Sequence, residues 1–193
     1  MRVSHSLVLA MVLLGGSGSA LAQGSRSSPY ANSLAPYIPS PQIIVERMLG
    51  LANVQPGETV YDLGSGDGRV LITAVQQFKA RAVGVELVPD IARKASDRIA
   101  KMGLQSQARV IQGDIRDADL SGADVVTMYL PTDSNEMLRP KLEKSLRPGA
   151  RVVSYSFKVP GWKFNKLEQD DPYGNGRQHA IYLYVMPPRR QRD

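Results

Sequence analysis

Apolar and polar positions follow two different spacings along this chain, and the two alternate from residue 42 onward. Short, nearly continuous apolar runs are typical of strands buried on both faces of a sheet. Such runs predict strands at 59–64, 81–87, 108–114, 123–130, 150–157 and 179–187. Between them, apolar residues recur every three or four positions, the spacing of one helix face. This second pattern predicts helices over 42–52, 69–78, 89–102 and 132–146.

Glycine and proline mark the ends of several of these elements. Pro89 suits the first turn of a helix, and Gly103 suits its C-terminal stop. Pro140 predicts either a kink in the last helix or the start of a second one. The alternation of strands and helices predicts an α/β fold, a doubly wound, mostly parallel sheet with helices on both faces. Ligands of such sheets bind beyond the carboxyl ends of the strands.

The first forty residues differ from the rest of the chain. Arg2, the eight apolar residues at 7–14 and the Ala-Leu-Ala at 20–22 together predict a cleavable export signal over residues 1–22. Eight apolar residues are too few to cross a bilayer as a helix, so we expect no stable membrane span. The expected location is periplasmic or secreted, and it is cytoplasmic if the signal does not function.

The remaining residues accommodate one domain. Residues 23–40 are rich in Ser, Gly and Pro and are expected to form an extended arm that separates the signal from the domain. The domain itself is expected over 41–187, and residues 188–193 form a basic tail. We expect a monomer.

The formal charge of +6 comes mostly from the termini. Between Pro29 and Met186 the chain has 19 basic residues against 17 acidic ones, so we expect no nucleic-acid partner. The absence of cysteine excludes disulfides, thiolate zinc sites and a cysteine nucleophile. The two histidines, His5 and His179, are too few and too far apart in the chain for a metal cluster, and we expect no metal.

A glycine-rich loop follows the first predicted strand, with Gly64, Gly66 and Gly68 at alternate positions and Ser65 between the first two. Glycines at this place let backbone N–H groups approach a ligand closely, and the following helix start favours a negative group. The spacing is G-x-G-x-G and differs from the G-x-G-x-x-G of dinucleotide sites. It therefore favours a smaller carboxylate over a diphosphate, and it disfavours the alternative of a nicotinamide oxidoreductase.

Acidic residues end three successive predicted strands, at Asp62, Glu86 and Asp114. An acid at the end of the second strand can accept hydrogen bonds from both hydroxyls of a ribose. Asp114 could accept from an exocyclic adenine amine. Because Glu86 is expected to face a crevice, we expect it to support ligand binding and to add little to the stability of the fold.

The segment from Asp62 to Arg69, with Glu86 and Asp114, resembles the first motifs of class I (seven-stranded) S-adenosylmethionine-dependent methyltransferases. The stretches 37–49, 60–74 and 126–157 further resemble the lysine methyltransferases that act on the ATP synthase c-subunit, and their bacterial relatives. The resemblance implies a seven-stranded Rossmann-like sheet, S-adenosyl-L-methionine as cofactor and a protein lysine as methyl acceptor. It places the methionine moiety on the loop 64–68 with Asp62, the ribose on Glu86, and the adenine on Asp114 and Ile115.

The acceptor side is less defined by the sequence. The resemblance places Tyr129, Leu130 and Pro131 at the end of the fourth strand, where many amino-group methyltransferases have Asn or Asp, two prolines and an aromatic residue. Lack of that tetrad argues against a DNA adenine or glutamine acceptor. The candidate catalytic residues are Tyr129 and Pro131, the latter through the carbonyls that it helps to fix, and core packing is the alternative role of Tyr129. Bacterial relatives often have an acid near the end of the fifth strand, where this chain has Tyr155 and Ser156.

Two aromatic positions and two functional alternatives stay open. Trp162 could line an acceptor pocket, but packing is the simpler explanation, and His179 is interpreted as a structural residue. A small-molecule methyltransferase would use the same cofactor site. An exported protein that binds S-adenosylmethionine or another ligand without turnover is the second alternative, because little S-adenosylmethionine is available outside the cytoplasm.

Overall fold

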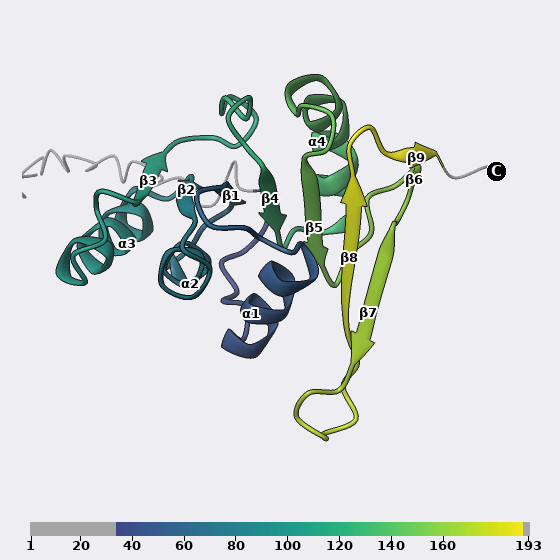
Figure 1. Cartoon of the computed structure of the whole chain (residues 1–193), viewed down its shortest axis with the longest axis horizontal. Helices are drawn as coiled ribbons and strands as arrows, with labels where there is room; N and C mark the ends of the chain where they lie inside the picture. The colour runs from purple at the N-terminus through teal and green to yellow at the C-terminus, as the bar shows by residue number, and fades with distance from the viewer. Residues whose placement is uncertain (1–33, 191–193) are drawn as a thin grey trace, which may run out of the picture.

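The structure is a computed structural model that describes residues 34–190 (Figure 1). The predicted export signal therefore lies outside the described residues. Within them, the helices are α1 (Gln42–Leu51), α2 (Arg69–Phe78), α3 (Pro89–Lys101) and α4 (Thr132–Ser145). The strands are β1 (Thr59–Leu63), β2 (Arg81–Glu86), β3 (Ala108–Gln112), β4 (Val125–Met128), β5 (Arg151–Tyr155), β6 (Trp162–Lys163), β7 (Lys166–Asp170), β8 (His179–Val185) and β9 (Arg189–Arg190).

Seven of these strands form one sheet in the order β3-β2-β1-β4-β5-β8-β7. The first five are parallel, while β8 runs antiparallel to both β5 and β7. The chain moves outward from β1 to β3 and then returns to place β4 on the other side of β1. This reversal puts the topological switch point between β1 and β4, where open α/β sheets bind their ligands. The predicted doubly wound, seven-stranded fold is confirmed.

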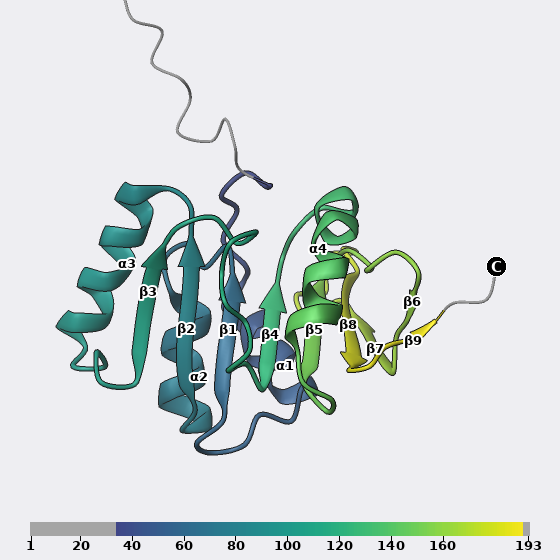
Figure 2. The same ribbon diagram turned by 90° about the horizontal axis from the view of Figure 1, so that it is seen from above.

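Helices cover both faces of the sheet (Figures 1 and 2). On one face, α1 and α2 pack against side chains such as Val60, Val125 and Val153. On the other, α4 packs against Val126 and Val152 with its own apolar residues. Successive residues of each strand alternate between the two cores, which is why the buried strands have almost no polar positions. Helix α3 packs against β2 and β3.

Two details differ from the sequence prediction, and one of the two alternatives predicted for Pro140 is excluded. Strand β7, Lys-Leu-Glu-Gln-Asp, lies at the sheet edge with mostly exposed side chains, so it lacks the apolar pattern of a buried strand. Arg189 and Arg190 of the predicted basic tail instead form β9 and pair with β6. Pro140 lies inside a single helix α4 and starts no second one; its exposed position keeps its ring away from the core.

Within residues 34–190, no helix has both the length and the apolar character needed to cross a membrane. The same range contains no group of three His, Asp or Glu side chains placed to hold a metal ion.

Candidate functional site

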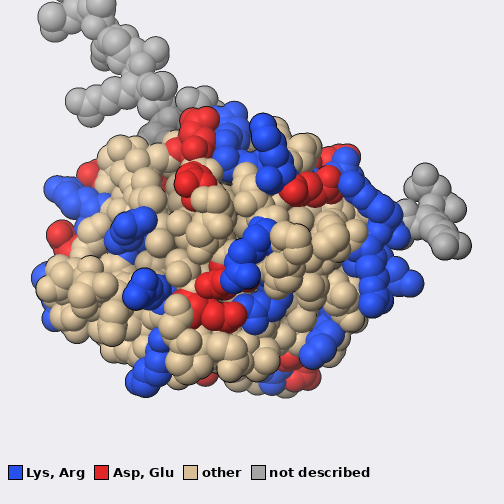
Figure 3. Space-filling model, turned by 45° about the horizontal axis from the view of Figure 1, so that its top comes forward, with Lys and Arg blue, Asp and Glu red and all other residues tan. Residues whose placement is uncertain are grey.

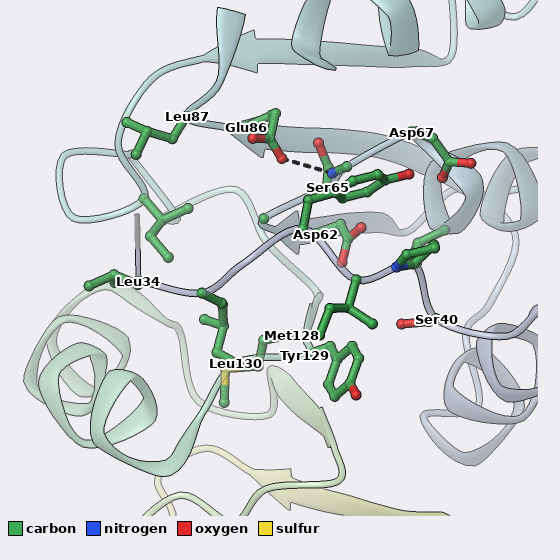
Figure 4. Close-up of a pocket in the computed structure, with 18 of the residues that line it drawn as sticks. Leu34, Ser40, Asp62, Ser65, Asp67, Glu86, Leu87, Met128, Tyr129 and Leu130 are labelled. Atoms are coloured by element: carbon green, nitrogen blue, oxygen red, sulfur yellow. Dashed lines mark hydrogen bonds between the residues drawn. The ribbon is translucent and has the colours of Figure 1, made fainter. Parts of the chain in front are cut away.

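A pocket opens at the carboxyl ends of β1, β2 and β4, at the switch point of the sheet (Figure 4). It has a volume of about 890 Å³, its open mouth included. The predicted cofactor residues that line it are Asp62, Gly64, Ser65, Gly66, Glu86, Asp114 and Ile115. The predicted acceptor residue Tyr129 lines it as well, from the end of β4. The fold thus brings residues from the ends of four strands, β1, β2, β3 and β4, together around one cavity.

Gly68 and Pro131 are not among the residues that line the pocket. A Cβ atom on Gly68 would lie 3.5 Å from the Cβ of Ala95 and 3.6 Å from Cδ1 of Ile99. Both are ordinary contact distances, so it is the backbone that favours glycine here: Gly68 is the N-cap of α2 and has a φ angle of 76°. Pro131 is the N-cap of α4, and its carbonyl accepts the hydrogen bond of the Asn135 N–H at 3.0 Å. The structure gives both residues a role in starting a helix.

Glu86 lies at the end of β2 and is only 7% exposed. Its Oε2 accepts a hydrogen bond from the backbone N–H of Gly66 at 2.9 Å (Figure 4), and its Oε1 accepts one from Val88 N–H at 2.9 Å. The carboxylate therefore fixes the glycine loop in addition to facing the pocket. The expectation that Glu86 adds little to stability is not supported, because both of its oxygens satisfy buried backbone donors.

Asp62 is a buried carboxylate on the same sheet face as its register partner Thr127. The Thr127 hydroxyl donates to Asp62 Oδ1 at 2.7 Å. Burial raises the pKa of Asp62 to about 7, and the nearby charges of Glu86 and Asp67 add to this effect while the Thr127 hydrogen bond opposes it. A cationic ligand group beside Asp62 would restore its ionised form. This arrangement fits the ammonium group of a methionine moiety.

Asp114 follows β3 and lines the same pocket. Arg116 binds this carboxylate through Nε, 2.9 Å from both oxygens, and through its backbone N–H, 2.8 Å from Oδ1. The hydrogen bonds of Arg116 hold the pKa of Asp114 below its usual value. Asp114 is therefore an oriented anionic acceptor, as hydrogen bonding to an adenine amine requires.

Residues 34–40 form the outer wall of the pocket, a feature that the sequence reasoning missed. We call this segment the strap. Its first carbonyl, of Leu34, accepts from the Ser134 hydroxyl of α4 at 2.5 Å. Its last carbonyl, of Ser40, accepts from Arg69 Nη1 of α2 at 2.7 Å. The strap thus joins α4 to α2 across the cavity (Figure 4). Residues 34–40 of the predicted arm are therefore part of the site and do not act as a spacer between the predicted signal and the domain.

Tyr37 is the strap residue that meets the glycine loop. Its ring lies where a Cβ atom on Gly66 would be, with Cε2 only 2.5 Å from that position. Burial raises the pKa of Tyr37, and the negative charges of Asp67 and Glu86 raise it further. The stretch 37–49 was one of those that resemble the family. The sequence therefore marked Tyr37 as a family position but did not show that it contacts the glycine loop.

The residues of the pocket fit S-adenosylmethionine. Ser65 Oγ is buried with no hydrogen-bond partner in the protein, and it lies in the loop predicted to hold the methionine moiety. Gly64 and Gly66 have φ angles of 81° and 50°, which turn the loop in a way that favours glycine. Carboxylates stand at the three strand ends where an ammonium, a ribose and an adenine amine would need acceptors.

The remaining aromatic residues divide into two groups. Trp162 is 2% exposed, packs against Tyr184 at a ring-centroid distance of 5.4 Å, and donates from Nε1 to Glu143 at 2.7 Å, so it is a packing residue. His179 Nδ1 lies 2.5 Å from the Tyr155 hydroxyl, and the Tyr155 ring lies 4.4 Å from that of Tyr129. Tyr129, Tyr155 and His179 form the second group, whose ring contacts extend from the pocket along the carboxyl edge of the sheet.

Comparison with known proteins identifies relatives of the whole domain. Residues 62–166 match the ANTKMT methyltransferase domain family. The chain is 46% identical over 152 residues to a protein-lysine N-methyltransferase of Saccharolobus islandicus (strain REY15A), covering 78% of this chain and 93% of that protein. It is 34% identical over 128 residues to the adenine nucleotide translocase lysine N-methyltransferase of Mus musculus, covering 66% of this chain and 56% of the mouse protein. The chain thus matches little more than half the length of the mouse relative.

Among solved structures, the chain is similar to an RNA methyltransferase from Salinibacter ruber in complex with S-adenosyl-L-homocysteine. The TM-score is 0.73 at 38% sequence identity, covering 81% of this chain and 98% of that one. The sequence resemblance, the fold and the cofactor prediction are therefore confirmed together. The chain belongs to the ANTKMT methyltransferase domain family and is an S-adenosylmethionine-dependent methyltransferase.

Proposed function

We propose that this enzyme transfers the methyl group to the side-chain nitrogen of a protein lysine. The observation that carries the proposal is the 46% identity to a protein-lysine N-methyltransferase across nearly the full length of that relative. The mouse relative is also named for a lysine acceptor in a protein.

When bound, S-adenosylmethionine supplies an electrophilic methyl group, so the protein has to align the acceptor and exclude water. Asp62, Ser65 and the glycine loop would hold the methionine moiety, and Glu86 the ribose. Asp114 and Ile115 would hold the adenine. The strap shields this cavity from solvent on its outer side. Tyr129, at the end of β4, places a hydroxyl and a ring face beside the cavity, where an amine could approach (Figure 4).

RNA is the second candidate acceptor, because the Salinibacter ruber structure is described as an RNA methyltransferase. Charge favours the protein acceptor. Strong binding to a phosphate backbone needs a basic surface. On the face shown in Figure 3, basic and acidic side chains are interspersed, and basic ones gather mainly along the right edge of the view. The near balance of charge between Pro29 and Met186 supports the same choice.

The acceptor class can be tested by transfer of a tritiated methyl group from S-adenosylmethionine to separated protein and RNA fractions of the source cells. We expect protease-sensitive, nuclease-resistant label that elutes as methylated lysine after acid hydrolysis. The Gly66→Val variant, which should not bind the cofactor, is the negative control. Label in RNA, or in small molecules alone, would show that the lysine assignment is wrong. Saturable cofactor binding without any label would favour the non-catalytic alternative.

We also propose that the protein is an exported monomer. The support for export is the pattern over residues 1–22, and the monomer is an expectation from the sequence. N-terminal sequencing of the native protein tests the first part, with a start near Gln23 as the expected result. An intact Met1 in a cytoplasmic fraction would contradict export. Sedimentation of the purified protein tests the second part.

A further inference from the structure

Five ring side chains form a continuous set of contacts that begins at the cofactor pocket and leads away from it. We call Tyr129, Tyr155, Phe157, Tyr173 and His179 the aromatic row. Tyr129 lines the pocket and lies 4.4 Å from Tyr155 and 6.1 Å from Phe157, measured between ring centroids. His179 follows at 5.8 Å from Tyr155, and Tyr173 at 5.8 Å from His179.

The aromatic row leads from the interior to solvent. Tyr155 is 4% exposed and forms its base, whereas Tyr129, Phe157 and His179 are half-buried and Tyr173 is 51% exposed. Tyr173 lies in the hairpin between β7 and β8, which projects from the body of the molecule (Figure 1). The ring contacts therefore connect an exposed ring, that of Tyr173, to the cofactor pocket through the buried ring of Tyr155.

Buried polar groups hold the row in place. The side-chain amide of Asn135 in α4, which is fully buried, donates to the carbonyls of Phe157 and Lys158 at 3.3 and 3.1 Å. The Ser154 hydroxyl donates to the same Phe157 carbonyl at 2.6 Å. Ser156 between them has a φ angle of 64°, a conformation unfavourable for a serine. The structure thus maintains a strained turn that presents the Phe157 ring next to Tyr129.

Aromatic faces carry partial negative charge and attract organic cations, above all ammonium groups with methyl substituents. We propose that the aromatic row receives the acceptor lysine and holds its ammonium group, in the unmethylated and methylated forms, against the ring faces. This inference rests on the proposed lysine acceptor. It deepens that proposal by naming the residues that recognise the acceptor and the cationic chemistry that they select.

The charges near the outer end of the row favour a basic segment over a nucleic acid. Asp170 is the register partner of His179, and Asp171 follows it directly. Asp171 accepts hydrogen bonds from the backbone N–H groups of Tyr173 and Gly176, so its carboxylate is fixed beside the row. Asp170 is paired with Arg47, whose Nη1 lies 2.7 Å from Asp170 Oδ2, so the attraction for a lysine-bearing peptide and the repulsion of phosphates rest on the Asp171 carboxylate. Stacking of a nucleobase on the same rings is the competing outcome of the test.

The test measures binding of a cation and of a neutral molecule of equal shape. The protein, saturated with S-adenosylhomocysteine, is titrated with Nα-acetyl-Nε-trimethyllysine methylamide and with its analogue in which a tert-butyl group replaces the trimethylammonium. Nuclear magnetic resonance of the aromatic side chains locates the site. We expect the cation to bind about 3- to 30-fold more tightly than the neutral analogue, with shifts at the Tyr and His signals of the row.

Two variants link this preference to the row. Phe157→Leu should bring the affinity ratio close to one while the affinity for S-adenosylhomocysteine stays unchanged, because Phe157 does not line the cofactor pocket. Phe164→Leu is the matched control, since Phe164 packs on Tyr182 away from the row, and it should keep the full ratio.

The inference would be overturned by any of three results: equal affinity for the two probes, no binding of either probe, or preferential binding of adenosine monophosphate at the row. If these results accompany methylation of protein lysine, the proposed function stands and only the role of the row is wrong. If the cation preference is present but protein lysine is not labelled, the row binds ammonium groups and the proposed function fails.

Discussion

The carboxylate of Glu86 accepts a hydrogen bond from the backbone N–H of Gly66 at 2.9 Å, between residues 20 positions apart in the chain. This contact joins the end of β2 to the loop that follows β1. The acid that the family resemblance assigns to the ribose therefore also determines the shape of the loop assigned to the methionine moiety. Substitutions at Glu86 are expected to affect binding and folding together.

Glu86→Ala should weaken S-adenosylmethionine binding and also lower the stability of the free enzyme, each by roughly 1–3 kcal/mol, because two backbone donors lose their acceptor. Glu86→Gln keeps one strong acceptor oxygen and should lie between wild type and Glu86→Ala. Calorimetric titration and urea unfolding measure the two quantities. An unchanged unfolding midpoint for Glu86→Ala would mean that the loop keeps its shape without this carboxylate.

Asp62 is expected to make both stability and cofactor affinity depend on pH. Its pKa is about 7 in the folded protein against 3.8 in the reference state, so the folded protein binds more protons between these values. The Asp62 contribution to stability therefore decreases as pH rises from about 4 to about 7, whereas affinity for the ligand ammonium increases through about 7.

Asp62→Asn should remove this decrease in stability with rising pH. It should raise the stability of the free enzyme at pH 8 by roughly 1–3 kcal/mol and weaken cofactor binding. Urea unfolding and calorimetric titration across pH 5–8 would measure both. A variant that keeps the wild-type pH dependence of affinity would exclude Asp62 as its source.

The strap should contribute to cofactor retention. A chain that begins at Pro41 lacks the outer wall of the pocket and should bind S-adenosylmethionine more weakly by roughly 1–3 kcal/mol, the range for losing one or two apolar side chains from an interface. A chain that begins at Gln23 retains the strap and is the control. Ser134→Ala, which removes the donor to Leu34, should increase the dissociation rate with a smaller change in affinity. Equal affinity of the two truncated chains would show that the strap is not part of the site.

Gly66→Val should abolish cofactor binding. Gly66 has a φ angle of 50°, and a Cβ atom there would lie 2.5 Å from the Tyr37 ring, so a β-branched residue would strain the loop and displace the strap. Gly57→Val is a matched control, because Gly57 has a φ angle of 83° but no atom within 4 Å of the added Cβ. The control should lose stability and keep its cofactor affinity. Loss of affinity in both variants would attribute the effect to general backbone strain.

The spacing of apolar residues was sufficient to predict the buried strands and all four helices, because burial on both faces leaves little freedom in residue type. It could not predict β7, whose exposed edge position allows polar residues such as Glu168 and Gln169. It also could not locate the short β6–β9 pair, since two-residue strands have no period.

The sequence by itself determined the cofactor half of this enzyme. The glycine loop and the acids Asp62, Glu86 and Asp114 are each defined by their position at or next to the carboxyl end of a strand, and parallel strands bring such positions to one edge. Only the tertiary structure decided that Gly68 faces α3, that Glu86 holds Gly66, that residues 34–40 cross the pocket, and that Tyr129, Tyr155 and His179 lie in contact. These relationships join segments that are distant in the chain, and their contacts depend on how helices and strands pack, which local spacing does not encode.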